Sequence, residues 1–370
     1  MTAPRAAVFG EAPWLFGARL DLLLFGGSAA LSLGLLLLGY VLGISSGDSP
    51  EWVWLVLVLG VDVAHVWSTL YRVYLDPAEL RRRPLVYAGV PLCCYAAGVA
   101  LHASSSMLFW RALAYLALFH FVRQQAGWLK LYHRRLPPGR WDAMLEVTTL
   151  YACMIYPVLQ WHAHLPRRFA WFVQGDFLTV PSTAMIALAS AAAPVYGALL
   201  VAFGLRSAQR FMRGDVHPGV VLLVLSTAAC WAAGIVLTNA DYAFTVTNVL
   251  IHGIPYLGLT LLYGQVRGAQ LPGSVLGRIM RAGLPVALLL LLGLAFAEEW
   301  LWDRFVWQER AWLFGEGSPA SSAALVWLVP LLSLPQTTHY ALDGLVWRKH
   351  GNPELGGLLT GQPRVPSQPA

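Results

Sequence analysis

The sequence predicts an all-α polytopic transmembrane helical bundle with about ten spans and both termini in the cytoplasm. Hydrophobic residues make up 57% of the 370 residues and charged residues only 12%, whereas soluble domains carry about 25% charged residues. Apolar segments of about 20 residues, the length that crosses a bilayer, recur along the chain. Cations gather in alternate connections between these segments, as the positive-inside rule requires. Together these observations predict a membrane protein.

Ten apolar segments are long enough to cross a bilayer. Their expected bounds are 21–44, 51–71, 85–103, 106–129, 143–163, 182–205, 219–238, 241–264, 279–297 and 321–347. The connections after the even-numbered segments hold most of the cations, which assigns them to the cytoplasmic side. These cations are Arg72, Arg81, Arg82 and Arg83; Lys130, Arg134, Arg135 and Arg140; Arg206, Arg210 and Arg213; and Arg267, Arg278 and Arg281.

The opposite connections are short or acidic, apart from Arg167 and Arg168. One of them, residues 298–317, is rich in Trp and acidic residues and is expected to lie on the outer interface. Near the two ends of the chain, Arg5 and Lys349 join the cytoplasmic cations. We therefore expect both termini in the cytoplasm.

Residues 1–348 are expected to form one transmembrane domain, followed by a disordered cytoplasmic tail at 349–370 that is rich in Gly and Pro. The four cysteines lie in apolar segments without CxxC spacing, which predicts neither a disulfide nor a thiolate metal site. The net charge of +6 lies mostly in the inner connections, and no basic run interleaves with aromatic residues. The expected partner is therefore the lipid bilayer, in a bacterial inner membrane, and not a nucleic acid.

Four of the apolar segments each contain a histidine, namely His65, His120, His252 and His339. All four segments are even-numbered, so the expected topology runs them in the same direction. His65, His120 and His339 precede the first inner cation by seven to ten residues, which places them about 10–15 Å from the inner helix ends. His252 lies somewhat deeper. Four imidazoles at similar depth on parallel helices can converge on one point.

Each of these histidines has a polar companion three or four positions away, on the same helical face. A carboxylate or amide that bonds the second nitrogen of a metal-bound imidazole fixes its tautomer and orientation. The companions expected in this role are Asp62, Gln124, Asn248, Gln336 and Asp343. Arg123 and Tyr256 share the same faces. The charge of Arg123 near a metal requires neutralisation by a carboxylate or by an anionic substrate, and Asp62 and Asp343 are the expected carboxylates.

An ionised residue at mid-bilayer costs roughly 2.5–3.5 kcal/mol on insertion scales, so such a cluster indicates a function. Neutral imidazoles suit Fe, Cu or Zn. We expect a four-histidine metal site with non-haem iron as the first choice, and Cu, Zn or haem as open alternatives. Iron with four neutral ligands leaves two positions for O₂ and a substrate, and a lipophilic small molecule can reach the site from the bilayer.

Two other functions remain open on the sequence. Intramembrane Asp, His and Arg residues also form the pathways of transporters, and Gly253 with Pro255 in "IHGIPYLG" can break a helix as transporter sites do. Four histidines on facing helices can also hold haem. Because the chain contains no CxxCH motif, this haem would be bound non-covalently. Transport and haem binding are therefore the alternatives to an oxygenase.

The four boxes resemble those of a known family. One histidine on each of four spans, "FHF" around His120 and "LPQTTHYALD" around His339 are similar to the Brp/Blh family of membrane β-carotene dioxygenases. The resemblance implies that His65, His120, His252 and His339 hold non-haem iron. It also implies an oxidoreductase that acts on a carotenoid- or lipid-like substrate.

A further polar group lies at the inner end of the second span. Tyr71, Arg72 and Asp76 occur together in "LYRVYLD". We expect this group to anchor a lipid headgroup or, as the alternative, to gate the site.

Overall fold

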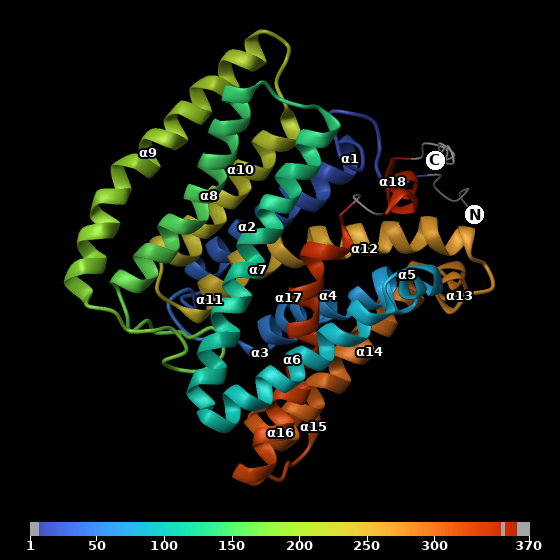
Figure 1. The fold of residues 1–370 in the computed structure, drawn as a ribbon. Coiled ribbons are helices and arrows are strands. Elements are labelled where there is room, and N and C mark those ends of the chain that lie inside the picture. Colours follow the sequence, from blue (N-terminus) through green and yellow to red (C-terminus); the bar gives the residue numbers. More distant parts are fainter. Residues whose placement is uncertain (1–6, 349–351, 361–370) are drawn as a thin grey trace. The chain divides into compact units, whose positions relative to one another are not determined.

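The computed structural model describes residues 7–348 and 352–360, and every regular element within them is a helix (Figure 1). The prediction of an all-α polytopic helical bundle is confirmed. Arg5 and Lys349, which contribute to the expected cytoplasmic charge, lie outside the described residues.

The first half of the chain contains α-helices interrupted by short π-helical segments, which are labelled η. These elements are α1 (Ala18–Asp21), η1 (Leu22–Gly27), α2 (Ser28–Val41), α3 (Glu51–Val53), η2 (Trp54–Val63), α4 (Ala64–Trp67), η3 (Leu70–Tyr74), α5 (Pro77–Arg82), α6 (Pro84–Ser104), α7 (Ser106–Arg135), α8 (Arg140–Ala163) and α9 (Ser182–Met212).

The second half has the same character. Its elements are α10 (Pro218–Trp231), η4 (Ala232–Val236), α11 (Asp241–Phe244), η5 (Thr245–Val249), α12 (Leu250–Gln270), α13 (Val275–Ala282), α14 (Leu284–Trp302), η6 (Asp303–Trp307), α15 (Ala311–Phe314), α16 (Ser322–Leu332), α17 (Leu334–Val346) and α18 (Pro353–Thr360).

Eight helical stretches of the described chain are long and apolar enough to cross a membrane. They are Ala18–Val41, Glu51–Tyr74, Pro84–Ser104, Arg140–Ala163, Ser182–Met212, Pro218–Val236, Asp241–Gln270 and Leu284–Trp307. The chain is therefore an integral membrane protein with several spans.

Two of the ten expected spans are helical but do not meet the same criteria of length and hydropathy. The expected span 106–129 lies in α7, where Arg111 and the polar residues from His120 to Gln125 lower the hydropathy. The expected span 321–347 is divided at Ser333 into α16 and α17, and each of these helices is shorter than 18 residues. Composition and length thus support eight spans. Of the other two expected spans, one is the more polar helix α7 and one is the pair of short helices α16 and α17.

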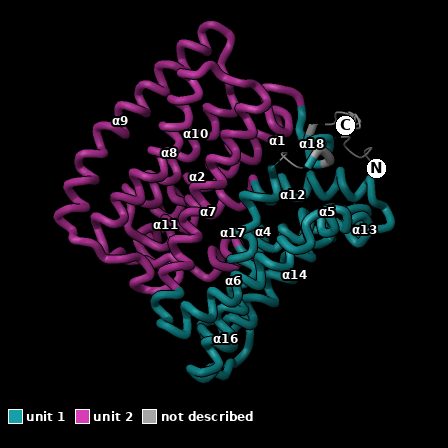
Figure 2. Tube along the Cα trace, viewed as in Figure 1, with its two compact units in different colours: residues 1–10, 63–109, 256–370 teal, residues 11–62, 110–255 magenta. Residues whose placement is uncertain are grey.

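Two compact units divide the described chain (Figure 2). Unit 1 comprises residues 1–10, 63–109 and 256–370, and unit 2 comprises residues 11–62 and 110–255. The sequence predicts one domain over residues 1–348, whereas the contacts within the chain gather into these two units. His65 and His339 belong to unit 1, and His120 and His252 belong to unit 2.

Unit 2 is built around α8, which packs along α9 and against α10 (Figure 1). After α10, η4 lies closely against η5. A β-carbon at Gly234 would lie 2.0 Å from Oγ1 of Thr247 and 2.6 Å from Nδ2 of Asn248, so only glycine fits there. Because η5 leads directly into α12, this contact fixes the start of the helix that carries His252.

In unit 1, α16 and α17 both pack on α6, and α14 packs against α4 and α13. The indole Nε1 of Trp67 donates a hydrogen bond to Oε2 of Glu298 in α14 (2.7 Å). The hydroxyl of Tyr71 donates to the carbonyl of Ala287 in the same helix (2.5 Å). These two bonds attach the helix that carries His65 to α14.

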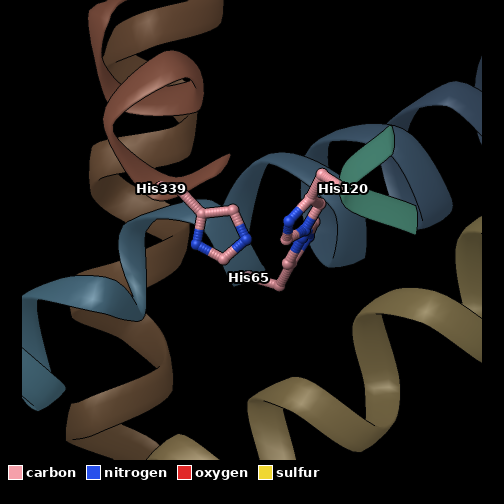
Figure 3. Close-up of side chains that lie close together, drawn as sticks. All are labelled: His65, His120 and His339. Atoms are coloured by element: carbon pink, nitrogen blue, oxygen red, sulfur yellow. The ribbon is translucent and has the colours of Figure 1, made fainter. Parts of the chain in front are cut away.

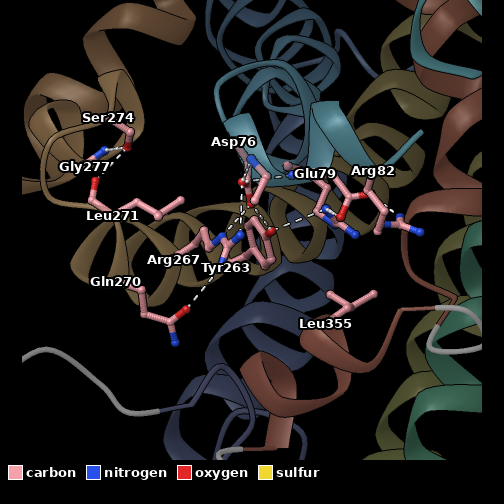
Figure 4. A network of polar contacts seen from close by, with 12 residues as sticks. Asp76, Glu79, Arg82, Tyr263, Arg267, Gln270, Leu271, Ser274, Gly277 and Leu355 are labelled. Carbon is pink, nitrogen blue, oxygen red and sulfur yellow. Dashed lines mark hydrogen bonds and ion pairs between the residues drawn. The ribbon is translucent and has the colours of Figure 1, made fainter. Parts of the chain in front are cut away.

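A buried ionic network joins the start of α5 to α12 in unit 1 (Figure 4). The guanidinium of Arg267 donates two hydrogen bonds to Asp76, from Nε to Oδ2 (2.7 Å) and from NH2 to Oδ1 (3.3 Å). The same carboxylate accepts a bond from the hydroxyl of Tyr263 (2.7 Å) and caps α5 through the N–H groups of Ala78 and Glu79. Asp76 is therefore both a helix cap and one half of a buried ion pair.

Arg72 and Glu79 form a second ion pair, with 3.0 Å between NH1 and Oε2. The guanidinium carbon of Arg72 lies 4.8 Å from the ring centroid of Tyr263 and 5.2 Å from that of Trp347. Its NH2 also donates to the carbonyl of Val346. The carboxylate of Glu79, two aromatic rings and a backbone carbonyl together compensate for the loss of hydration when Arg72 is buried.

The expectation that Tyr71, Arg72 and Asp76 anchor a headgroup is wrong. Each of the three side chains is 0% exposed, so none can reach a lipid headgroup. They stabilise unit 1 from inside.

The tail 349–370, for which the sequence predicts disorder, contains helix α18 over residues 353–360. Asn352 precedes this helix and forms hydrogen bonds both with the helix and with Glu79 of α5. Its Oδ1 accepts a hydrogen bond from the N–H of Leu355 (3.0 Å), and its Nδ2 donates to Oε2 of Glu79 (3.1 Å). Residues 349–351 and 361–370 lie outside the described residues.

We expect the stability of the protein to fall in acid because of Glu79. Burial alone would raise its pKa, but the charge of Arg72 and hydrogen bonds from Arg82, Tyr87 and Arg72 outweigh burial and lower the pKa from 4.5 to about 2. A carboxylate with a depressed pKa stabilises the fold above its unfolded-state pKa. This contribution, on the order of 3 kcal/mol, is lost as the pH falls from about 4.5 to about 2.

Thermal unfolding in detergent, followed across this pH window, checks the prediction. The Glu79→Gln variant should be less stable at neutral pH and should lose most of the pH dependence. Glu309→Gln is the matched control, because the side chain of Glu309 is 64% exposed. The same pH dependence in wild type and Glu79→Gln would contradict the assignment.

Candidate metal-binding histidines

In unit 1, helices α4 and α17 bring together His65 and His339. Both side chains are 1% exposed, and their ring centroids lie 5.0 Å apart at an interplanar angle of 87°. Figure 3 shows the imidazole of His339 beside that of His65, with one nitrogen of His339 directed toward it. The ring of Tyr256 packs edge-on against both, with centroid distances of 6.0 Å to His65 and 5.0 Å to His339.

Thr69 holds the imidazole of His339 in place. Its Oγ1 lies 2.7 Å from Nδ1 of His339, and both side chains are buried. Thr69 follows His65 by four residues, so the helix that carries one histidine also supplies the hydrogen bond that orients the other. With Nδ1 bonded to Thr69, Nε2 is the nitrogen of His339 that can act as a metal ligand.

The local helix geometry around His65 is unusual. Helix α4 is only four residues long and lies between the π-helical segments η2 and η3. π-Helical turns are uncommon and frequently occur at functional sites, since they widen the helix and turn side chains to new directions. The direction of His65 is therefore set by a local departure from the α-helix.

The pair in unit 1 fits a transition metal. One ring nitrogen of each histidine lies within 4.8 Å of the other, and two imidazoles on one ion at about 2.0–2.1 Å each are separated by about 3–4 Å. A small rotation of the two side chains would bring the two ring nitrogens to the separation that a shared ion requires. The donors are neutral, buried imidazoles, which Fe, Cu and Zn accept.

In unit 2, helices α7 and α12 bring together His120 and His252. They are 2% and 1% exposed, and their ring centroids lie 4.9 Å apart at 88°. The ring of Phe121 stacks on His252 at 3.6 Å and 9°. The carboxylate of Asp62 and a ring nitrogen of His252 lie within 4.8 Å of each other. Unit 2 thus contains a second buried histidine pair, with one carboxylate close to it.

Two of the expected companions in unit 2 bond to the backbone rather than to an imidazole. The amide of Gln124 donates to the main-chain carbonyl of His252 (3.2 Å). The amide of Asn248 donates to the carbonyl of Phe244 (3.3 Å) and to Oγ1 of Thr247 (3.0 Å). Both residues therefore fix the backbone around His252 and act on its ring only through that backbone.

Arg123 has a different partner from the carboxylates expected for it. Its NH1 donates to the hydroxyl of Tyr151 in α8 (3.2 Å). This bond directs the guanidinium toward α8 within unit 2.

The companions expected for His339 lie on its own helix. Gln336 and Asp343 both belong to α17 and are partly buried. On the ring of His339, the structure shows a hydrogen bond between Nδ1 and Oγ1 of Thr69. Thr69 and Phe121 contact the histidines but are not predicted from the sequence. The i, i+4 spacing of Thr69 from His65 was the only available signal.

Comparison with models of known protein families, with curated proteins and with solved structures gives no match to this chain. The class of protein is defined by the fold and the site alone: a polytopic integral membrane protein with two buried histidine pairs. These histidine groups are suited to binding a metal ion.

Replacing Thr69 with valine is expected to weaken metal binding about 10–100-fold, the usual effect of removing a hydrogen bond to a ligating imidazole. Valine keeps the shape of threonine but cannot accept a bond from Nδ1 of His339. Titration of the metal-free protein with Co²⁺, followed by its visible absorption, measures the affinity. Thr260→Val is the control, since the hydroxyl of Thr260 bonds only to carbonyls of its own helix. Equal Co²⁺ affinity of Thr69→Val and wild type would show that Thr69 does not orient a ligand.

Proposed function

We propose that the protein is a membrane metalloenzyme, a non-haem iron oxygenase that acts on a lipophilic, carotenoid- or lipid-like substrate. The observation that carries the proposal is the hydrogen bond between Nδ1 of His339 and Oγ1 of Thr69, beside the buried ring of His65. A buried imidazole with one nitrogen fixed and the other directed to a second imidazole has the arrangement of a metal ligand.

The residues proposed to hold the metal are His65, His339, His120 and His252. The first two form the pair in unit 1 and the last two the pair in unit 2. Iron bound there would supply the activation of O₂. The chain itself supplies neutral donors, the hydrogen bond that orients His339 and the exclusion of water, since each of the four rings is at most 2% exposed.

The proposal is tested by oxygen consumption. The protein is stripped of metal, loaded with Fe²⁺ and placed in vesicles made from bacterial membrane lipids with added β-carotene. We expect O₂ uptake that requires iron and that falls to the level of the metal-free protein in His339→Ala. The His164→Ala variant should retain it, because His164 is exposed and bonds only to its own helix. Iron-loaded protein that consumes no O₂ above the metal-free protein would contradict the oxygenase.

Transport is the second candidate function. The observation that favours it is Asp62 beside His252 in unit 2, because a carboxylate next to an imidazole inside a membrane is also the unit of a proton relay. Proton flux into vesicles that persists without metal and is lost in Asp62→Asn would support this function over the oxygenase.

A further inference from the structure

Arg167 is a buried cation in unit 2. It lies in the connection between α8 and α9, and the residue is 8% exposed. Its NH2 donates hydrogen bonds to the carbonyls of Ile235 (2.7 Å) and Thr238 (2.6 Å), where η4 ends. The guanidinium carbon lies 5.8 Å from the ring centroid of Trp161 and 5.6 Å from that of Phe169. The helix end and the two rings therefore fix the position of the guanidinium.

These contacts leave the charge of Arg167 without a counterion. Three other arginines of the described chain are buried to a similar degree, and each forms an ion pair with a carboxylate. The pairs are Arg72 with Glu79 (3.0 Å), Arg210 with Glu146 (3.2 Å) and Arg267 with Asp76 (2.7 Å). Because a buried charge is strongly destabilising unless it is paired, buried charges in proteins normally have a partner of opposite charge. Among the buried arginines that the structure describes, Arg167 alone lacks one.

The nearby acidic residues have other partners. Asp176 and Asp241 are the acids nearest in sequence to Arg167 and to Thr238. Oδ2 of Asp176 accepts hydrogen bonds from two main-chain N–H groups of its own loop (2.7 and 3.3 Å), and Oδ2 of Asp241 accepts one from the N–H of Ser49 (2.9 Å). Burial lowers the pKa of Arg167, and no carboxylate acts in the opposite direction. The counterion therefore has to come from outside the described chain.

One nitrogen of the guanidinium is open to a ligand. Nε of Arg167 has no hydrogen-bond partner and essentially no accessible surface, so nothing can reach it. NH1 also has no partner among the described residues, but it is not closed off in this way. The next residue, Arg168, is exposed, and its main-chain N–H donates to Oδ1 of the exposed Asn239 (3.0 Å). An accessible donor of a buried cation thus adjoins a second, exposed cation.

The site lies where membrane spans end. The connection that holds Arg167 joins the spans Arg140–Ala163 and Ser182–Met212, and the carbonyls that it contacts follow or end the span Pro218–Val236. Span ends lie at the level of the lipid headgroups. Arg167 and Arg168 are also the two cations that depart from the expected charge distribution, so the positive-inside rule does not account for them.

We infer that Arg167, together with Arg168, binds the phosphate group of an anion, which serves as the missing counterion of Arg167. The N–H groups of a guanidinium match the oxygens of a phosphate in both charge and geometry. The phosphate belongs to a lipid headgroup or to a free phosphate ion, and both sources present the same oxygens. The inference goes beyond the proposed oxygenase, because this site needs neither the metal nor the histidine pairs.

Two binding measurements on the metal-free, detergent-purified full chain test the inference. Equilibrium dialysis against ³²P-labelled orthophosphate probes the free ion, and retention of phosphatidylglycerol, counted by native mass spectrometry, probes the lipid. We expect saturable binding of one of these probes, weakened about tenfold or more in Arg167→Gln, because a hydrogen bond between two charged groups is lost. Arg111→Gln should bind like wild type. Arg111 is the matched control, since it is a less buried arginine of unit 2 that also donates to a carbonyl, that of Gly175 (3.1 Å).

Thermal unfolding of the wild type gives a second measurement that does not depend on the folding of a variant. The bound probe should raise the unfolding midpoint above that in chloride of equal ionic strength or in phosphatidylcholine, because a ligand of the native state stabilises it. Orthophosphate binding that is lost in Arg167→Gln would assign a free anion, and phosphatidylglycerol retention that is lost without orthophosphate binding would assign a headgroup. Binding that is equal in wild type and Arg167→Gln, or a wild type that neither probe binds or stabilises, would overturn the inference.

Discussion

Replacing His339 with alanine is expected to weaken Co²⁺ binding by more than about 100-fold, because removing only the hydrogen bond to a ligand already costs about 10–100-fold. His65→Ala should have the same effect, since the two buried rings lie edge to face in unit 1, with 5.0 Å between their centroids. The measurement is a Co²⁺ titration of metal-free protein, followed by visible absorption. His164→Ala is the control, because Nδ1 of this exposed histidine bonds to the carbonyl of Gln160 (2.8 Å).

The same titration on His120→Ala and His252→Ala decides how the two pairs act. A single Co²⁺ per chain that is lost in all four variants would establish one shared ion. Two Co²⁺ per chain, of which one remains in each variant, would establish a separate ion for each pair. Unchanged binding in all four variants would show that these histidines are not ligands, whatever metal the protein contains.

Replacing Asp76 with alanine is expected to destabilise the protein by about 3–5 kcal/mol, the usual cost of removing one partner of a buried ion pair. Asp76 is 0% and Arg267 3% exposed, so the variant leaves the guanidinium of Arg267 in the interior without its carboxylate. It also removes the cap of α5 and the acceptor of the Tyr263 hydroxyl. Asp48→Ala, at an exposed position, should change the stability by less than about 0.5 kcal/mol.

The double variant Asp76→Ala/Arg267→Met separates the ion pair from the cap. If the buried charge is the main cost, the double variant should be more stable than the sum of the two single variants predicts, because it leaves no unpaired charge. Thermal or denaturant unfolding in detergent measures all four proteins. Additive effects of the two substitutions would contradict the assignment of Asp76 and Arg267 as an energetically coupled pair.

The fold class was predictable because long apolar segments identify membrane-spanning helices by composition alone. Long apolar runs specify helices in a bilayer whatever they pack against, so the expected spans 21–44 and 182–205 correspond closely to Ala18–Val41 and Ser182–Met212. The division into two units was not predictable in the same way. It depends on contacts between residues far apart in the sequence, for example those of α16 and α17 with α6.

Burial was the property that sequence reasoning handled least well. Arg72 follows the second span and reads as an inner-face cation, yet it is completely buried between Glu79, Tyr263 and Trp347. The partners that cover Arg72 come from a short helix after the span, from α12 and from the end of α17. None of these contacts leaves a signal in hydropathy.

The buried histidine pairs were predictable as polar residues inside apolar helices, whereas the residues that contact them were less so. The histidines were found because a polar residue in a membrane helix is costly and therefore informative. Thr69 was missed because a lone threonine in an apolar helix reads as packing, and its partner His339 is 270 residues away. The companions were chosen on α-helical spacing, whereas η2 and η5 place π-helical turns beside His65 and His252, where that spacing no longer holds.

The metal content of the purified protein is the most direct test of the proposed non-haem metal site. Elemental analysis together with an optical spectrum, on wild-type protein that still unfolds cooperatively, measures the metal content and detects haem. We expect one or two iron ions per chain and no Soret band. Folded protein without stoichiometric metal, even after exposure to Fe²⁺, Cu²⁺ and Zn²⁺, would contradict the metalloprotein, and a Soret band would assign the histidines to haem.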